Sequence, residues 1–291
     1  MSAARVYDYL LGGSTNFRPD REAAAALQRA LPSAQRDVWA NRSFLGRAVA
    51  YLLDQGVTQF LDLGSGLPTV GNVHEVAHAR DPGARVVYVD CDPVAVEHAR
   101  DLLEDIDGVA VLESDLRDVG EVLNSSEVRD LLDFSRPIGL LAVAVLHFVA
   151  RCDDPVSILG GYAEALVPGS HLVISHATGH TLDRDQVATA AAVYADTDTP
   201  LTLRTPMQVA ELFTGFTLLP PADGAPAEVV PVSQWRPDPL EPEIQTRTVY
   251  GGVGLLPAPD GAADVASSVR GAAPRAMPPL TATTSATGVR L

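Results

Sequence analysis

The sequence predicts an α/β fold in which a mostly parallel sheet carries helices on both faces. Between residues 57 and 177, five short apolar runs alternate with segments whose apolar residues recur at three- and four-residue spacing. The runs are rich in Val and Leu and lack regular polar alternation, as expected of strands buried on both faces. Strands that alternate with helices are typical of a parallel sheet, because each helix connects two neighbouring strands.

Two helices are expected before the first strand. Residues 20–54 have apolar residues at helical spacing, and Pro32 divides them into two pieces. Asp92 followed by Pro93 is a typical helix start, since Asp caps the first turn and proline fits within it. The chain then predicts strands at residues 57–64, 84–90, 108–114 and 137–148, with helices at 71–81, 93–105 and 119–132 between them.

The second half continues the pattern and then changes. A helix at 155–166, a strand at 171–177 and helices at 183–194 and 206–213 are expected. Residues 216–220 and 249–256 resemble a closing antiparallel pair of strands, joined by a proline-rich connection that contains Trp235. Residues 257–291 are mostly Ala, Pro, Gly, Ser and Thr, and cannot bury enough surface to offset their ordering entropy. The expected organisation is a domain at 1–256, with a helical cap at 1–55 and an α/β core at 56–256, and a disordered tail at 257–291.

Composition excludes several classes of function. The chain has 37 acidic and 21 basic residues and a formal charge of -16, which disfavours binding to nucleic acid or anionic membranes. All 21 basic residues are Arg, so lysine Schiff-base chemistry is excluded. The chain has no apolar segment of roughly 20 residues, as a membrane span requires, and a cytoplasmic protein is expected. Cys91 and Cys152 form no CxxC pair and are expected to be reduced and buried.

The stretch LDLGSGLP (61–68) predicts a ligand-binding loop after the first strand. Gly64 and Gly66 let the chain turn sharply and bring its amides close to a ligand. A dinucleotide fingerprint requires a third glycine at position 69, where this chain has Thr69. Asp62 ends the strand, and Ser65 lies between the two glycines. On this loop alone, a tight turn without a ligand remains an alternative.

Acids at the ends of the next two strands point to a nucleoside. Asp90 ends the strand in VVYVDCDP, where its carboxylate can accept hydrogen bonds from both ribose hydroxyls. We assign the neighbouring Cys91 to the same site. Asp115, in ESDLRD, is placed to accept from the amine of an adenine ring, with Leu116 against the ring face. A helix cap is the alternative for each acid, and Asp92 fills that role better than Asp90.

The order of DLGSG, VYVDCDP, ESDLRD and LLAVAVLHF resembles class I S-adenosylmethionine-dependent methyltransferases. ARVYDYLLGGSTNFRPDREAA, NRSFLGRAV and FLDLGSGLPTVGNVHEVA resemble, more narrowly, a bacterial S-adenosyl methyltransferase family formerly described as a domain of unknown function. The resemblance covers residues 4–256 and implies a Rossmann-like class I methyltransferase fold. That fold has a seven-stranded, mostly parallel sheet and a helical N-terminal cap over S-adenosylmethionine. Ser14 and Thr15 depart from the family pattern, which we expect to have a basic or polar residue followed by an acid.

The cap contains residues suited to covering a ligand and excluding water. This segment combines aromatic rings, glycines and an amide, in Tyr7, Tyr9, Gly12, Gly13, Asn16 and Phe17. Arg42, on the second expected helix, could pair with the methionine carboxylate of the cofactor, for which a guanidinium offers a two-pronged match. An exposed helix arginine is the alternative. Asn41 is a further candidate.

His147 is the candidate catalytic residue. It follows the fourth expected strand, whose carboxyl end faces the sulfonium methyl group in this fold, and Leu146 and Phe148 flank it. A histidine there could act as general base for an oxygen or nitrogen nucleophile, or it could line the pocket. We assign Leu146 to the cofactor site. No metal is expected: His176 and His180 have no evident third ligand, and the helix that carries His74 and His78 is expected to pack against the sheet.

The predicted function is transfer of a methyl group from S-adenosylmethionine to an oxygen or nitrogen nucleophile of a small molecule. One alternative is a regulatory or interaction protein that binds the same cofactor without turnover. A second, an NAD-dependent oxidoreductase, is disfavoured by Thr69 and by the absence of lysine from the chain. The expected partner is a small-molecule acceptor, with no nucleic acid or membrane.

Overall fold

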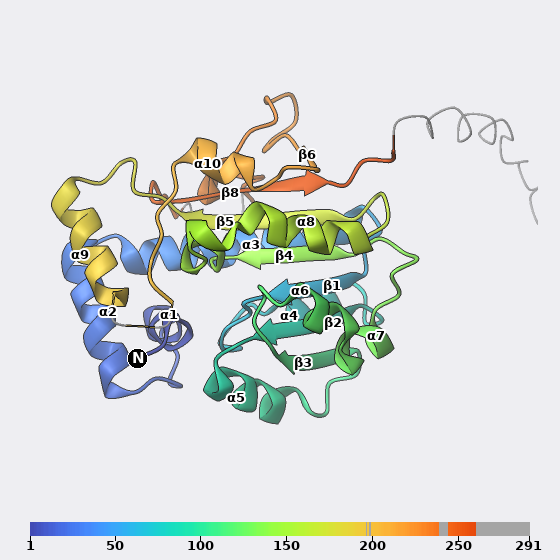
Figure 1. Cartoon of the computed structure of the whole chain (residues 1–291), viewed down its shortest axis with the longest axis horizontal. Helices are drawn as coiled ribbons and strands as arrows, with labels where there is room; N and C mark the ends of the chain where they lie inside the picture. The colour runs from blue at the N-terminus through green and yellow to red at the C-terminus, as the bar shows by residue number, and fades with distance from the viewer. Residues whose placement is uncertain (196, 198, 239–243, 260–291) are drawn as a thin grey trace, which may run out of the picture. The chain divides into compact units, whose positions relative to one another are not determined.

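The computed structural model describes residues 1–195, 197, 199–238 and 244–259 (Figure 1). Met1–Pro257 forms one compact unit. All but the first three residues of the predicted tail at 257–291 lie outside the described residues, so the expected disorder stays a prediction.

Five parallel strands form the larger part of the sheet, in the order β3, β2, β1, β4, β5. β8 pairs antiparallel with β5, and β6 and β7 pair antiparallel with β8. The described residues therefore form an eight-stranded, mostly parallel sheet, which confirms the α/β class. The strands are β1 Gln59–Leu63, β2 Arg85–Asp90, β3 Val109–Glu113, β4 Gly139–Val143, β5 His171–Ala177, β6 Thr217–Leu218, β7 Val230–Pro231 and β8 Val249–Leu255.

The sheet differs from the prediction in strand number and in one strand end. The additional strand is β7, a two-residue pairing inside the proline-rich connection. The strand expected at 137–148 ends at Val143, because Ala144 adopts a left-handed φ of 56° and Leu146–Phe148 forms a 3-10 turn. The two strands expected to close the sheet, β6 and β8, do pair antiparallel.

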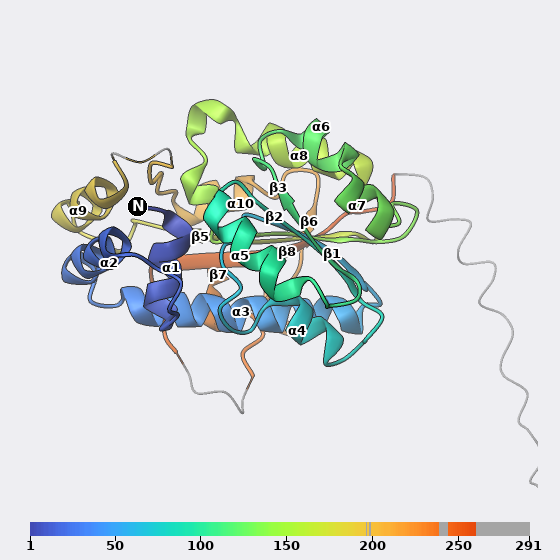
Figure 2. The same cartoon turned by 90° about the horizontal axis from the view of Figure 1, so that it is seen from below.

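Helices cover both faces of the sheet, as predicted. On one face α3 (Ala34–Asp54), α4 (Val73–His78) and α5 (Pro93–Leu103) enclose an apolar core that includes the buried Trp235. On the other face α6 (Val119–Asn124), α7 (Ser126–Leu131), α8 (Pro155–Ala165) and α10 (Pro206–Glu211) enclose a second core. Figure 2 shows α3 and α4 on one side of the strands and α6 and α8 on the other.

Three helices, not two, precede the first strand. The aromatic segment near Tyr7 forms α1 (Ala3–Leu11), which Gly12 ends with a φ of 87°. α1 packs against α2 (Arg18–Ala30), and α9 (Arg184–Tyr194) packs against α2 in turn. Figure 1 shows these three helices at the end of the sheet toward which the arrows of β1 and β4 point. The sequence missed α1 because its nine residues are too few to establish a helical period before the glycine pair.

Candidate active site

A cavity of about 500 Å³ lies where α1, α2, α3 and α9 meet the carboxyl ends of β1, β2, β4 and β5. Its size falls within the range of small-molecule sites. Twelve of the predicted site residues line it: Tyr7, Asn41, Arg42, Asp62, Gly64, Ser65, Gly66, Asp90, Cys91, Asp115, Leu116 and His147. Six do not: Tyr9, Gly12, Gly13, Asn16, Phe17 and Leu146.

The glycine loop requires glycine for two physical reasons. Gly64 and Gly66 have left-handed φ angles of 68° and 65°, which side chains with a Cβ rarely adopt. A Cβ at Gly64 would also lie 2.1 Å from the side chain of Val145. The amides of Gly64 and Ser65 both donate to the carbonyl of Val89, at 2.8 and 3.1 Å. The loop is therefore folded back onto the end of β2.

Asp90 connects this loop to the start of α5. Its Oδ2 accepts from the amide of Gly66 at 2.7 Å, and its Oδ1 accepts from the amide of Asp92 at 2.9 Å. Burial raises the pKa of Asp90 above its ordinary value, although these amide hydrogen bonds oppose the shift. Asp92 caps α5 by accepting from Val94, so capping does not account for Asp90. Each carboxylate oxygen of Asp90 keeps a second lone pair for a ligand hydroxyl.

Asp62, in β1, and Arg42, on α3, both line the cavity. Burial raises the pKa of Asp62 to about 7, Arg42 opposes that shift, and Asp90 adds to it. Arg42 is half-buried, and its guanidinium lies over the ring of Tyr7, 5.5 Å from the centroid. Its Nε is buried and has no hydrogen-bond partner among the described residues. Arg42 is therefore not the exposed helix arginine of the alternative interpretation.

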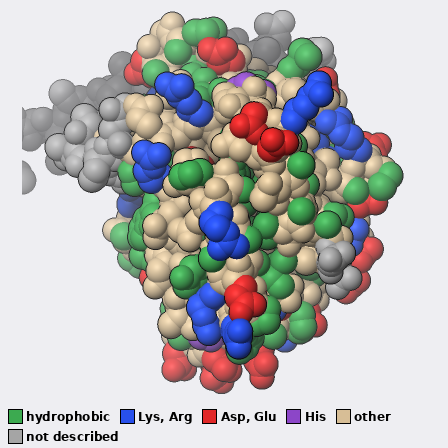
Figure 3. Space-filling model, turned by 90° about the vertical axis from the view of Figure 1, so that its left-hand side faces the viewer, with side chains coloured by type: hydrophobic (Ala, Val, Ile, Leu, Met, Phe, Trp, Pro, Cys, Tyr) green, Lys and Arg blue, Asp and Glu red, His purple; other side chains and the backbone are tan. Residues whose placement is uncertain are grey.

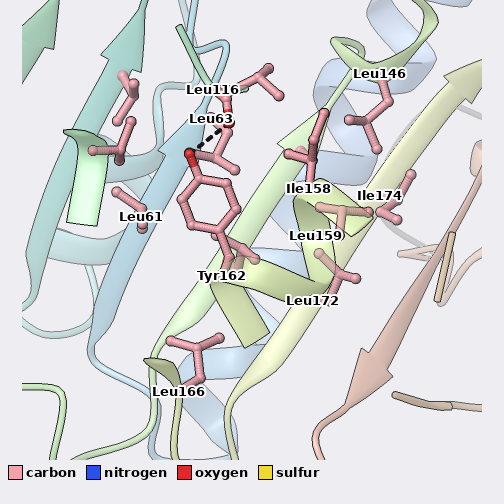
Figure 4. Packing of buried hydrophobic residues seen from close by; sticks show 14 of the residues in the cluster. Leu61, Leu63, Leu116, Leu146, Ile158, Leu159, Tyr162, Leu166, Leu172 and Ile174 are labelled. Atoms are coloured by element: carbon pink, nitrogen blue, oxygen red, sulfur yellow. Dashed lines mark hydrogen bonds between the residues drawn. The ribbon is translucent and has the colours of Figure 1, made fainter. Parts of the chain in front are cut away.

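Asp115 and Leu116 are held in place after β3 by two neighbours. Arg117 donates to Asp115 at 2.6 Å and also pairs with Asp153 at 3.2 Å. Burial alone would raise the pKa of Asp115, but the hydrogen bonds from Arg117 bring it below its ordinary value. The hydroxyl of Tyr162 on α8 donates to the Leu116 carbonyl at 2.8 Å, as the dashed line in Figure 4 shows. The segment beside the expected adenine is thus fixed.

His147 is buried at the cavity wall as a neutral imidazole. Its Nδ1 accepts from the amide of Ala177 at 3.3 Å, which leaves the proton on Nε2. Burial, His176 and Arg204 all lower its pKa well below the ordinary value. Arg204 is itself buried and donates to the carbonyls of Leu146 and Val149, so it fixes the turn that presents His147. This geometry fits a pocket wall or a hydrogen-bond donor better than a general base.

The N-terminal segment is attached to the cavity rim at two places. Arg5 on α1 pairs with Asp92 at 2.9 Å and with Asp20 on α2 at 3.0 Å. Asp8 on α1 accepts from the hydroxyl of Thr69, in the glycine loop, at 2.8 Å. Residues 1–5 themselves line the cavity. We call α1 and residues 12–17 the lid.

Five predicted lid residues do not line the cavity, and they lie near the end of α1 or between α1 and α2: Tyr9, Gly12, Gly13, Asn16 and Phe17. Asn16 donates to Asp8 at 2.9 Å and to the Gly13 carbonyl at 3.0 Å. A Cβ at Gly13 would lie 1.9 Å from Oδ1 of Asp8, so only glycine fits there. Tyr9 is exposed, and Gly12 ends the helix. Arg5 and Asp8 were not predicted. Their one signal in the sequence is that both are charged residues in a short aromatic segment.

The expectation for the cysteines was half wrong. Both are free, but Cys91 and Cys152 are exposed rather than buried. Cys91 follows β2 directly and opens onto the cavity, which explains its exposure.

Among the described residues there is no cluster of three or more His, Cys, Asp or Glu suited to a metal ion. Within the same residues, no helix combines the length and the apolar character that crossing a membrane requires.

The sheet order and the site define the class of protein. The parallel strands lie in the order β3, β2, β1, β4, β5, and the antiparallel β8 and β6 follow β5. A glycine loop follows β1, and the acid Asp90 ends β2. This is a class I, S-adenosylmethionine-dependent methyltransferase.

Comparison with known proteins identifies the family. A family model described as S-adenosyl methyltransferase matches residues 1–257, and the chain belongs to that family. A crystal structure of a candidate methyltransferase from Thermobifida fusca YX is 37% identical over 88% of this chain and 95% of its own, with a TM-score of 0.80. A DUF574 family protein from Streptomyces avermitilis MA-4680 is 36% identical, and the match covers 88% of this chain and 97% of that protein, with a TM-score of 0.79. No curated protein matches the chain.

Proposed function

We propose that this enzyme transfers the methyl group of S-adenosylmethionine to an oxygen or nitrogen nucleophile of a small molecule bound under the lid. The observation that carries the proposal is that Arg42 and Asp62 both line the cavity beside the glycine loop. The methionine end of the cofactor has a carboxylate and an ammonium group. Arg42, whose Nε has no hydrogen-bond partner among the described residues, would bind the carboxylate, and the buried Asp62 would bind the ammonium.

The remaining predicted residues are assigned along the cofactor. Asp90 would bind the ribose hydroxyls, and Asp115 and Leu116 the adenine, with Cys91 beside them. Gly64, Ser65 and Gly66 would allow the close approach of the nucleoside. Tyr9, Gly12, Gly13, Asn16 and Leu146 would act indirectly, by shaping the lid and the turn after β4.

The charge of the cavity favours this cofactor over a dinucleotide. Arg5 is paired with Asp92, so Arg42 is the remaining arginine that lines the cavity. An anionic pyrophosphate would be repelled by the acids, whereas a sulfonium cation would be attracted. The lining acids are Asp37, Asp62, Asp90, Asp92 and Asp115.

Catalysis would come chiefly from orientation and exclusion of water. The sulfonium methyl is already reactive, so alignment with the nucleophile supplies most of the rate. When bound, S-adenosylmethionine would supply an electrophilic methyl group with sulfur as the leaving group, the residues of the cavity would hold it in line with the nucleophile, and the nucleophile would lose its proton to solvent. His147 would contribute a hydrogen bond from Nε2 to the acceptor, rather than remove that proton.

The outer face over α2 and α9 also supports a small acceptor. Figure 3 shows acidic, basic and hydrophobic side chains interspersed there. With the net charge of -16, this mixture offers little attraction to a nucleic acid.

The test is to incubate the protein with methyl-labelled S-adenosylmethionine and fractionated cell extract, and then to separate small molecules, protein and nucleic acid. The proposal expects label in the small-molecule fraction, on an oxygen or nitrogen atom located by NMR of the product. Label found only in macromolecules, or on carbon, would overturn it. Calorimetry with the homocysteine product of the cofactor measures binding independently of any acceptor.

A further inference from the structure

The end of the cavity away from the glycine loop is apolar. Its walls come from α2, α9 and the segment after α9, which contribute Leu27, Leu31, Tyr194, Leu201 and Leu203. Val38 on α3 and Phe148 after β4 pack in the same cluster as Leu27, Tyr194 and Leu201. We call this part of the cavity the acceptor chamber.

One carboxylate lies at the wall of this chamber. Asp37, in the first turn of α3 and directly before Val38, lines the cavity and is only 5% exposed. Its Oδ2 accepts from the hydroxyls of Ser33 at 2.8 Å and Thr248 at 2.7 Å. Its Oδ1 is buried and has no hydrogen-bond partner among the described residues. Within the same part of the chain, no Arg or His lies within 4.0 Å of it.

Asp37 is set apart from the residues assigned to the cofactor. It precedes Arg42 by five residues on the same helix, which corresponds to about 7.5 Å along the axis. Asn41 lies between them and donates to the hydroxyl of Tyr7 at 2.9 Å, and it accepts from the hydroxyl of Ser175. This neutral network separates the two charged groups. A cofactor held at Arg42 and Asp62 would therefore leave Asp37 for a second ligand.

A buried carboxylate oxygen without a donor is unfavourable, because it has lost its hydration and gained nothing in return. An ammonium group would satisfy Oδ1 with a charge-assisted hydrogen bond, and the leucines around it would bind an apolar body. An acceptor that carried a carboxylate or phosphate there would meet repulsion instead.

We propose that the acceptor chamber binds an apolar amine, whose ammonium pairs with Oδ1 of Asp37 and whose apolar body packs against the residues of α2 and α9 that line the chamber. This inference rests on the proposed function. Since an ammonium has no free lone pair, the group at Asp37 anchors the acceptor, and a second oxygen or nitrogen of the same molecule receives the methyl. The anchored molecule extends from Asp37 toward the turn at His147.

The experiment uses the full chain saturated with S-adenosylhomocysteine and two matched pairs of probes, studied by calorimetry. Tryptamine is compared with its neutral counterpart tryptophol, and 2-phenylethylamine with 2-phenylethanol. The proposal expects each amine to bind at least about tenfold more tightly than its alcohol, a difference near 1.4 kcal/mol. Asp37→Asn should abolish this preference. Asp101→Asn removes the same charge from the exposed face of α5, outside the cavity, and should keep the preference.

Equal binding of amine and alcohol by the wild-type protein would overturn the proposal, as would an absence of amine binding in the millimolar range. A preference for the amine over the alcohol that survives in folded Asp37→Asn would also overturn it, because another acid would then bind the ammonium. The wild-type comparison needs no variant, so it holds even where Asp37→Asn fails to fold. Failure to bind S-adenosylhomocysteine would refute the proposed cofactor contacts, whereas binding of that molecule without amine preference refutes only the acceptor class.

Discussion

The hydroxyl of Thr69 in the glycine loop donates to Oδ1 of Asp8 on α1, at 2.8 Å. Position 69 is where a dinucleotide-binding fold requires its third glycine. Here the side chain at that position connects the glycine loop to the lid. The lid and the glycine loop are therefore expected to respond together to substitution.

Thr69→Val should lower the free energy of unfolding and loosen the lid. Valine keeps the shape of threonine but leaves Oδ1 of Asp8, which is buried, without its donor, at a cost of about 1–3 kcal/mol. S-adenosylhomocysteine should also bind several-fold more weakly. Urea unfolding and calorimetry measure the two effects. Thr214→Val is the matched control, because the hydroxyl of the exposed Thr214 donates only to a carbonyl of its own turn. An unchanged urea midpoint would contradict the role of this bond.

Gly13→Ala should break the same connection from the other side. The new methyl would overlap Oδ1 of Asp8, whereas Gly12→Ala meets no atom within 4 Å and strains only the left-handed backbone. Each glycine variant is therefore combined with Thr69→Val, and the free energy of unfolding of each double variant is measured. The losses should be strongly non-additive for Thr69→Val with Gly13→Ala, and additive for Thr69→Val with Gly12→Ala. Additive free energies in both double variants would mean that Gly13 does not position Asp8.

Asp62 should make both stability and cofactor binding depend on pH. Its pKa is raised from 3.8 to about 7 in the folded protein, chiefly by burial. Between these values the folded state keeps a proton that the unfolded state has lost, so the free energy of unfolding should fall as pH rises through this window. Asp90, whose pKa is also raised, contributes in the same direction. Asp62→Asn should make the free energy of unfolding depend less steeply on pH in this window, although Asp90 keeps part of the dependence.

The affinity for S-adenosylhomocysteine should change in the opposite sense. Its ammonium pairs with the ionised form of Asp62, so binding should tighten as pH rises through about 7. Calorimetry from pH 5.5 to 8.5 measures this, with Asp62→Asn as the reference. An affinity of the wild-type protein that follows that of Asp62→Asn at every pH would remove Asp62 from the site.

Most of the sheet and the cofactor end of the cavity could be predicted from the sequence, because both follow from local patterns. The buried strands are continuous apolar runs, and in a parallel sheet their carboxyl ends meet at one edge. That rule alone brings Asp62, Asp90 and Asp115 to one cavity. The early end of β4 could not be predicted, since the left-handed Ala144 lies within an unbroken apolar run.

The acceptor end could not be predicted, because its residues come together only by tertiary packing. Asp37 is one of two acids on α3, a helix of mixed composition. Its unpartnered Oδ1 is evident only in the folded chain, where Thr248, 211 residues away, donates to its Oδ2. The contact between Asp8 and Thr69 likewise joins segments 61 residues apart. Neither pair carries a local spacing that sequence reasoning could use.

Arg42→Lys should weaken binding of S-adenosylhomocysteine by about tenfold or more while leaving stability nearly unchanged. Lysine keeps the charge but lacks the planar fork that matches a carboxylate, a difference worth about 1–2 kcal/mol. Stability should persist because Nε of Arg42 has no partner among the described residues to lose. Arg80→Lys, at an exposed pair with Asp54, is the control. Equal affinities of Arg42→Lys and the wild-type protein would rule out a two-pronged contact.

His147 should remain neutral across the physiological range, with its proton on Nε2. Burial, the neighbouring His176 and the cation of Arg204 lower its pKa, and the amide of Ala177 occupies Nδ1. Two-dimensional NMR of protein labelled with nitrogen-15 histidine reads the tautomer and the titration directly, and His147→Ala assigns the signal. We expect the Nε2–H pattern without a titration step between pH 5.5 and 8. A step near the ordinary value of 6.5, or a proton on Nδ1, would restore His147 as a general base, because the Nε2 lone pair would then be free to take the proton of the nucleophile.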